Sequence, residues 1–117
     1  MSTDTNKVAA RRFFEEGING NRPELGDELF DPEFTDHNPL PSQPLGRAAG
    51  RYIVEFLKRT YVTPNIRIED IFADGDRVAL RWSAGPKDSP VVEALVILRF
   101  RNGKVLERWA AFNRHDV

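Results

Sequence analysis

The chain contains no cysteine, which excludes a disulfide framework and a thiolate metal site and suits a reducing compartment. It has no excess of one charge either, since 17 basic and 18 acidic residues give a formal net charge of −1. Mixed charges of this kind lack the basic surface that binds nucleic acid. No apolar run approaches the roughly 20 residues that cross a bilayer, and residues 1–7 lack the apolar centre of a signal peptide. We therefore expect a cytoplasmic protein with no nucleic-acid or membrane partner.

Metal and cofactor motifs are also missing. The two histidines, His37 and His115, lie far apart in sequence and belong to no His-x-His or His-Glu-x-x-His pattern. The glycines fall in turns and helix caps rather than in a phosphate-binding loop. We expect neither a metal nor a cofactor. The length of 117 residues predicts one domain, residues 1–117, with a hydrophobic core of its own.

The first half of the chain has helical periodicity. A first helix is predicted to end at Gly17, and its apolar face consists of Ala10, Phe13, Phe14 and Gly17. Pro23 suits the first position of a short second helix, which Asp31-Pro32 would end. A third helix, closed by Pro64, carries the clearest apolar stripe, made of Ala49, Tyr52, Ile53, Phe56, Leu57 and Thr60.

Between the second and third helices, residues 33–38 are expected to form a short strand. The strand leads into residues 39–46, where three prolines within six residues exclude a helix and favour an extended, ordered loop.

The second half is predicted to be an antiparallel meander. Asp74-Gly75 and Asn102-Gly103 suit tight hairpin turns, because both central residues of a type I′ turn need a positive φ. The expected strands cover residues 65–73, 76–84, 91–100 and 104–113. The strand 91–100 is apolar at nearly every position, so both of its faces should be covered. One face can pack on the helices, and we expect the outer face to form a homodimer.

Three stretches resemble the SnoaL-like polyketide cyclases of the nuclear-transport-factor-2-like superfamily: residues 9–18, residues 34–46 (FTDHNPLPSQPLG) and residues 102–113 (NGKVLERWAAFN). The resemblance spans almost the whole chain. It implies an α+β fold in which three N-terminal helices pack on a curved, mainly antiparallel sheet, forming a cone with a central cavity. The same superfamily contains enzymes and pure binding modules, so the fold does not fix the function.

The resemblance implies two alternative functions. In the first, the cavity binds a small hydrophobic or aromatic carbonyl compound, and proton abstraction next to the carbonyl leads to cyclisation, isomerisation or dehydration, as in an isomerase or lyase. In the second, the domain is a non-catalytic ligand-binding or dimerisation module. A third alternative, an epoxide hydrolase relative, needs carboxylates and an arginine in the cavity, for which Glu93, Glu107, Arg81 and Arg99 are available.

His37 is the first catalytic candidate. In the cyclase-like family the histidine of the Asp-His-x-Pro motif faces the cavity, and a neutral imidazole can accept a proton near pH 7. Alternatively, His37 is a half-buried histidine that hydrogen-bonds the backbone and holds the proline-rich loop. Because neighbours on a strand point to opposite faces, Asp36 and His37 should not lie side by side.

Asn113 is the second catalytic candidate. The strand pattern puts Glu107, Trp109 and Asn113 on one face, together with Val105 and Ala111. Resemblance to the cyclases puts the general acid/base aspartate at the position of Asn113. A carboxamide cannot relay a proton, but it can donate a hydrogen bond to an enolate oxygen. The alternative is a polar residue facing water at the end of a strand.

The remaining candidates would bind the substrate. Trp109 and Trp82 can stack on a planar ligand, although ordinary core packing is the alternative for both. Glu93 interrupts an apolar strand and either enters the cavity or pairs with Arg81 across the sheet. Tyr52 and Phe14, on the apolar helix faces, complete the predicted lining.

Overall fold

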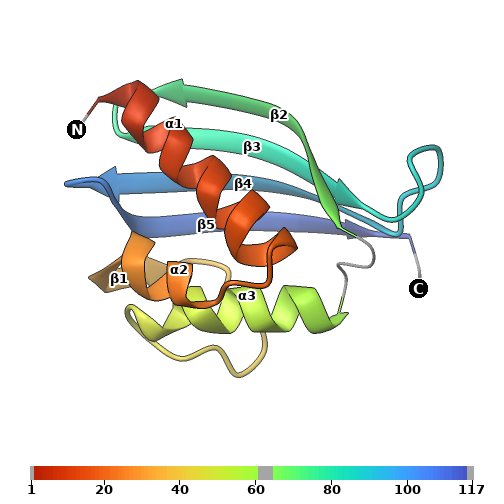
Figure 1. The fold of residues 1–117 in the computed structure, drawn as a ribbon, viewed down its shortest axis with the longest axis horizontal. Coiled ribbons are helices and arrows are strands. Elements are labelled where there is room, and N and C mark those ends of the chain that lie inside the picture. Colours follow the sequence, from red (N-terminus) through yellow and green to blue (C-terminus); the bar gives the residue numbers. More distant parts are fainter. Residues whose placement is uncertain (1, 61–64, 116–117) are drawn as a thin grey trace.

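The computed structural model describes residues 2–60 and 65–115. Helices occupy the first half and the strands of a curved sheet most of the second, as expected (Figure 1). The order of elements is α1 (Thr3–Arg12), η1 (Phe13–Asn19), α2 (Glu24–Leu29), β1 (Phe30–Asp36), α3 (Ala48–Thr60), β2 (Ile66–Asp74), β3 (Arg77–Ala84), β4 (Val92–Arg101) and β5 (Lys104–Arg114). The predicted α+β architecture is confirmed.

The helical segments differ from the prediction in detail. The first helix does not end at Gly17 but continues to Asn19 as a π-helix. The wider π-helical turn keeps Phe13, Phe14, Gly17 and Ile18 all buried. The second helix ends at Leu29 rather than at Asp31-Pro32, because β1 begins at Phe30. Pro64, expected to close the third helix, lies outside the described residues.

The sheet has the strand order β1-β5-β4-β3-β2, and all pairs are antiparallel except β1 with β5. The predicted Asn102-Gly103 turn is confirmed, with a positive φ at both residues. The first hairpin is shifted by one residue, because Asp74 still pairs with Arg77 and the turn is Gly75-Asp76, with a positive φ at Gly75 only. Figure 1 shows α1 crossing one face of this sheet, with α3 running along the β1–β5 side.

The face toward the helices, called the inner face below, carries the core. Alternate residues of β3 and β4 point inward and are at most 3% exposed: Val78, Leu80, Trp82, Ala84, Val92, Ala94, Val96, Leu98 and Phe100. They pack in one cluster with aromatic side chains of η1 and β1, namely Phe13, Phe14, Phe30 and Phe34. Burial of this set is what attaches the helices to the sheet.

One predicted face assignment is wrong. Val105 was expected to share a face with Glu107 and Trp109, but it is 1% exposed and pairs with the inward Phe100. A register shift next to Phe100 places an extra residue in β5, so that Glu107 pairs with the outward Arg99. The bulge reverses the alternation between Val105 and Glu107.

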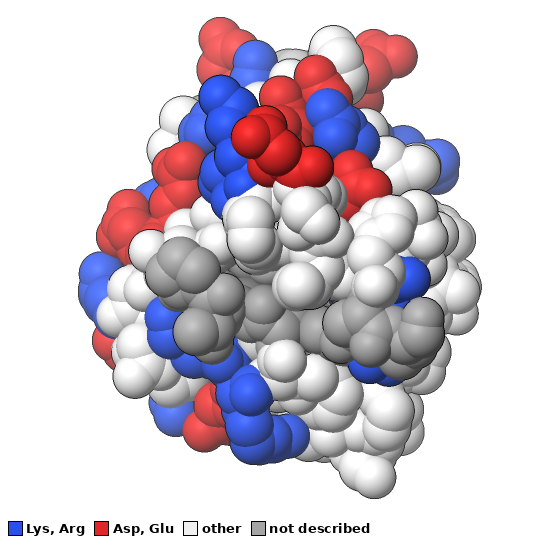
Figure 2. All heavy atoms as spheres, turned by 90° about the vertical axis from the view of Figure 1, so that its right-hand side faces the viewer, with Lys and Arg blue, Asp and Glu red and all other residues white. Residues whose placement is uncertain are grey.

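The outer face of the sheet keeps large apolar side chains in contact with solvent. Phe72 is 67% exposed, Leu95 61% and Ile97 41%. At one end of the molecule the two charges are mixed: Figure 2 shows acidic and basic groups side by side along its upper edge. Among the described residues, no helix combines the length and apolarity needed to cross a membrane.

Candidate functional site

The sequence-predicted site residues fall on both faces of the sheet. Trp82 (1% exposed) and Phe14 (3%) belong to the core, which confirms the packing alternative for Trp82. Tyr52 packs beside this core, and its hydroxyl donates to the carbonyl of Pro41 in the proline-rich loop. These three side chains lie on the helix side of the sheet.

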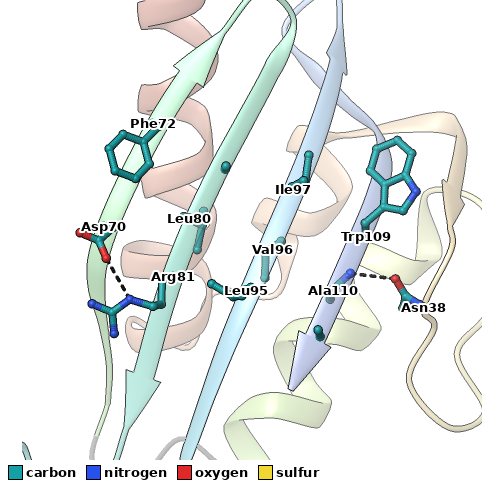
Figure 3. Close-up of a pocket in the computed structure, with 12 residues that line it drawn as sticks. Asn38, Asp70, Phe72, Leu80, Arg81, Leu95, Val96, Ile97, Trp109 and Ala110 are labelled. Atoms are coloured by element: carbon teal, nitrogen blue, oxygen red, sulfur yellow. Dashed lines mark hydrogen bonds and ion pairs between the residues drawn. The ribbon is translucent and has the colours of Figure 1, made fainter. Parts of the chain in front are cut away.

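A groove of about 670 Å³ crosses the outer face (Figure 3). Its apolar lining includes Phe72 from β2, Leu95 and Ile97 from β4, and Trp109 from β5. In Figure 3 these side chains stand in front of the strands and the helices lie behind them. The sequence predicted a cavity between helices and sheet, whereas this groove opens on the opposite face.

His37 lies at one end of this face, just beyond β1. Its ring stacks on Trp109 with 4.6 Å between ring centroids and 8° between planes. Its Nε2 is 2.8 Å from Oε2 of Glu107, and Arg99 donates to the other oxygen of that carboxylate. An ionised carboxylate only accepts, so Nε2 carries the hydrogen and Nδ1 is left as the proton acceptor. We call His37, Glu107 and Arg99 the His37 cluster.

Electrostatics fix the charge of Glu107. Its pKa is held below the ordinary value, first by the hydrogen bond from His37 and then by that from Arg99. The side chain is 21% exposed and therefore only partly screened by water. Glu107 is thus a carboxylate that orients the imidazole, in the way that a carboxylate orients a catalytic histidine.

Directly behind this cluster, the neighbouring residues form a second ion pair on the inner face. Arg108 Nη1 donates to Asp36 Oδ2 at 2.7 Å, and both side chains are 4% exposed. Gln43 of the proline-rich loop donates to the same Asp36 oxygen at 2.8 Å. Asp36 and His37 therefore point to opposite faces, as predicted, and it is Asp36 that anchors the proline-rich loop.

Asn38 links the loop to the groove. Its Oδ1 accepts from the backbone N–H of Ala110 at 2.9 Å, and the residue lines the groove beside Trp109 (Figure 3). The amide nitrogen of this side chain supplies N–H donors next to the aromatic surface. Sequence reasoning did not single out Asn38.

Glu93 and Asn113 meet at the other end of the outer face, where they are cross-strand partners. With Arg81 they line a cavity of about 250 Å³. Glu93 lies 3.8 Å from Arg81, as its structural alternative predicted, and its Oε2 lies 3.0 Å from Nε2 of His115.

His37 and Asn113 are not brought together. His37 contacts Trp109, and Asn113 follows Trp109 by four residues on β5, a distance of about 13 Å along a strand. Among residues 2–60 and 65–115, no group of three carboxylate or imidazole side chains could hold a metal ion.

The sequence signal for Glu107 was present. Its position two residues before Trp109 places it on the face of the candidate site, although from the sequence alone its carboxylate suggests a role only in the epoxide hydrolase alternative. The pairing with His37 depends on the parallel contact between β1 and β5, which joins Thr35 to Glu107 and Asp36 to Arg108. A contact across 70 positions cannot be read from local periodicity.

Solved structures define the class to which this fold belongs. A candidate polyketide cyclase of Bacillus cereus ATCC 10987 is 25% identical, with a TM-score of 0.74 and coverage of 97% of this chain and 79% of the other. TsrD of Streptomyces laurentii is 16% identical, with a TM-score of 0.75 and coverage of 97% and 91%. A nuclear-transport-factor-2-like protein of Mesorhizobium loti is 21% identical, with a TM-score of 0.70 and coverage of 95% and 93%. The fold is nuclear-transport-factor-2-like.

The family follows from the sequence match. The model of the SnoaL-like domain matches residues 10–108, which is most of the chain, so the protein belongs to the SnoaL-like domain family. The resemblance found in the sequence is thereby confirmed. No curated protein matches the chain.

Proposed function

We propose that the protein is a homodimer-forming SnoaL-like module whose subunits associate through the outer face of the sheet. The observation that carries this proposal is the groove lined by Phe72, Leu95, Ile97 and Trp109. Soluble monomers rarely expose contiguous apolar surface of this kind, and larger patches mark interaction sites.

The high exposure of the groove walls favours a broad partner surface over a small ligand. A drug-sized ligand is usually buried over most of its surface. Here Phe72 is 67% and Leu95 is 61% exposed, so the walls do not close over a ring-sized molecule. A flat protein surface buries such side chains far more completely.

Charge favours a second copy of the chain as that surface. The apolar strip is bordered at one end by Arg99 with Glu107 and at the other by Arg81 with Asp70. Each end holds both signs, so two copies meet without a net like-charge conflict. The formal net charge of −1 adds little long-range repulsion.

The oligomeric state of a charged variant tests the dimer. Leu95→Lys puts an ammonium group into the centre of the groove and should convert the protein to a monomer in light scattering over a micromolar concentration series. Val8→Lys is the matched control, because Val8 is 59% exposed but lies on α1. A wild-type monomer at every concentration, or a dimer that survives Leu95→Lys, contradicts the proposal.

A second candidate function is proton transfer on a small hydrophobic or aromatic carbonyl compound, and the His37–Glu107 hydrogen bond is the observation that favours it. The ring of the substrate would stack beside Trp109. Nδ1 of His37 would take the proton as the C–H bond next to the carbonyl breaks. The electron pair moves onto the carbonyl oxygen, which needs a hydrogen-bond donor.

Two carboxamides could stabilise that oxygen. Asn38 lines the same groove as Trp109, whereas Asn113 lies about 13 Å along β5 and does not reach the same small ring. We therefore assign the donor to Asn38 for a one-ring substrate.

Deuterium exchange tests this second function. The probe is α-tetralone, an aromatic ketone, followed by proton NMR in D2O at neutral pH. Wild-type protein should accelerate exchange next to the carbonyl, and His37→Ala should abolish the acceleration, while Asn113→Ala should leave it unchanged. Equal exchange with His37→Ala and wild type would show that His37 moves no proton.

A further inference from the structure

The outward side chains of the sheet form four rows that cross β2, β3, β4 and β5, because the strand registers align one residue of each strand in every row. The two end rows are polar. The first row, at the end that carries His37, consists of Asp74, Arg77, Arg99 and Glu107. The fourth row, at the other end, consists of Arg67, Ser83, Glu93 and Asn113. Neighbouring rows are about 7 Å apart, since each lies two residues further along its strands.

The two middle rows form the apolar groove. The second row consists of Phe72, Ala79, Ile97 and Trp109, and the third of Asp70, Arg81, Leu95 and Ala111. In Figure 3, Phe72, Ile97 and Trp109 lie across the sheet in one line, with Arg81 and Leu95 in the next.

The sizes of the side chains in the middle rows are complementary between one row and the other. On β5 the largest side chain, Trp109, belongs to the second row, and the exposed Ala111 holds the same strand position in the third. Packed sheet faces interdigitate, and a large side chain needs a small one opposite. A copy whose third row lies on this second row therefore fits better than one that places Trp109 opposite another Trp109 or opposite Phe72.

The order of charges in the end rows points the same way. Both central strands carry an arginine in the first row, and both flanking strands carry an acid. If two copies met with like ends together, Arg77 would face the partner's Arg99, and Asp74 would face the partner's Glu107. Like charges placed opposite each other in an interface are strongly unfavourable. Turning the partner end for end removes both conflicts.

We infer that two copies of the chain associate end for end, about a two-fold axis that runs across the strands between the second and third rows. The first row of each copy then meets the fourth row of its partner. Arg99 contacts the partner's Glu93, and Trp109 covers the partner's Ala111. The inference rests on the proposed dimer and adds its geometry.

The ion pairs within each chain are compatible with this contact. Arg99 is bonded to Glu107 and lies 3.6 Å from Asp76, while Glu93 lies 3.8 Å from Arg81. The signs therefore alternate from Glu107 through Arg99 to the partner's Glu93 and the partner's Arg81.

The remaining contacts of the two end rows are complementary as well. Asp74 faces the partner's Arg67, and Arg77 faces the hydroxyl of the partner's Ser83. Glu107 faces the partner's Asn113, whose carboxamide can donate to a carboxylate. Asp76, in the turn beyond the first row, comes to the partner's loop between β3 and β4, which carries one charge of each sign, Lys87 and Asp88.

Charge reversal tests the arrangement through the dimer dissociation constant, measured by sedimentation. Arg99→Glu and Glu93→Arg should each raise it roughly tenfold or more, because two like-charged contacts arise in every dimer. An equimolar mixture of the two variants, one of them with an affinity tag, should form heterodimers about as tight as wild type, since both contacts are again between opposite charges. Asp4→Arg is the matched control for Glu93→Arg, because it makes the same change of charge on the exposed side of α1, and it should not rescue Arg99→Glu.

The outcomes separate the geometry from the dimer itself. If like ends meet, Arg99→Glu places a carboxylate opposite the partner's Arg77 and tightens the dimer, which overturns the inference. A mixture of Arg99→Glu and Glu93→Arg that forms no heterodimer, or rescue by Asp4→Arg, also overturns it. A wild-type monomer at every concentration overturns the dimer proposal.

A swap of sizes gives a second test that changes no charge. Ala111→Trp puts a second indole opposite the partner's Trp109 and should weaken the dimer roughly tenfold. Trp109→Ala combined with Ala111→Trp restores one large and one small side chain at each contact and should recover most of the affinity. Both positions lie on the outer face, so the urea midpoints of the variants at concentrations where the chain is monomeric should remain close to that of wild type. A double variant as weak as Ala111→Trp alone overturns the end-for-end contact.

Discussion

On the inner face of the sheet, Asp36 and Arg108 form an ion pair whose side chains are each 4% exposed. The adjacent residues, His37 after Asp36 and Glu107 before Arg108, form a second pair on the outer face. Their side chains are 39% and 21% exposed. The two pairs have nearly the same length, 2.7 Å and 2.8 Å. Strand alternation directs the two pairs to opposite faces of the sheet, and their exposure differs accordingly.

The comparison separates a structural role from a surface role. The inner pair is hydrogen-bonded to the proline-rich loop and to the residue before it. Gln43 donates to Asp36, and Arg108 donates to the carbonyl of Asn38. Two charges out of water need such partners, because each unpaired one would be costly. The outer pair is in contact with solvent, contributes little to folding and is accessible to a partner.

Removal of Arg108 should have the largest effect. Arg108→Leu leaves the Asp36 carboxylate buried without its countercharge, and we expect a loss of about 3–5 kcal/mol in the free energy of unfolding measured with urea. The double change Asp36→Leu with Arg108→Leu should recover much of this loss, because no buried charge remains. A loss from Arg108→Leu as small as that from Glu107→Leu would show that the two pairs are equivalent.

The same contrast can be made with two leucines on neighbouring strands. Leu80 of β3 points inward and is 3% exposed, whereas Leu95 of β4 points outward and is 61% exposed. Leu80→Ala should cost about 2–5 kcal/mol through the cavity it leaves. Leu95→Ala should change the stability of the dilute protein by no more than about 0.5 kcal/mol. Comparable losses for both would mean that the outer face is covered within the single chain.

The contrast between the faces was partly predictable. The hairpin turns and the alternation in residues 76–84 and 91–100 follow from local sequence, and they were sufficient to predict an apolar outer face. The inward position of Val105 was not, because a bulge beside Phe100 shifts β5 by one residue. Bulges of this kind depend on the pairing of strands rather than on the residues of one strand.

The candidate site was harder to predict than the fold. Resemblance to relatives suggested that His37 and Asn113 act together, and spacing alone put Trp109 and Asn113 on one face. The strand geometry separates them, since Trp109 pairs with Ile97 and Asn113 with Glu93 further along β4. A shared face therefore does not imply a shared site, because a strand extends by about 3.3 Å for each residue.

The role of the inner pair in holding the loop predicts a smaller effect at Gln43. Its amide nitrogen donates to Asp36, and its oxygen accepts from the backbone N–H of Leu40. Gln43→Ala removes one donor from a buried carboxylate and leaves a partly buried N–H without this partner, at a cost of about 1–2 kcal/mol. Gln43→Glu, which puts a second carboxylate beside Asp36, should be worse. Unchanged urea midpoints for both variants would separate the ion pair from the loop.

The smallest effect, and the one that is specific to pH, belongs to the outer pair. The pKa of Glu107 is lowered in the folded protein, chiefly by the hydrogen bond from His37. A carboxyl group with a lowered pKa stabilises the fold above its unfolded pKa, and that contribution is lost as the pH falls through the folded value.

Glu107→Gln cannot titrate. Between about pH 6 and pH 3, the urea midpoint of the wild type should therefore fall slightly more steeply than that of Glu107→Gln. Glu55→Gln, at an exposed position of α3, should follow the wild-type curve. If the Glu107→Gln curve were parallel to that of the wild type, the hydrogen bond from His37 would have no energetic consequence, and the exposed pair would be incidental to folding.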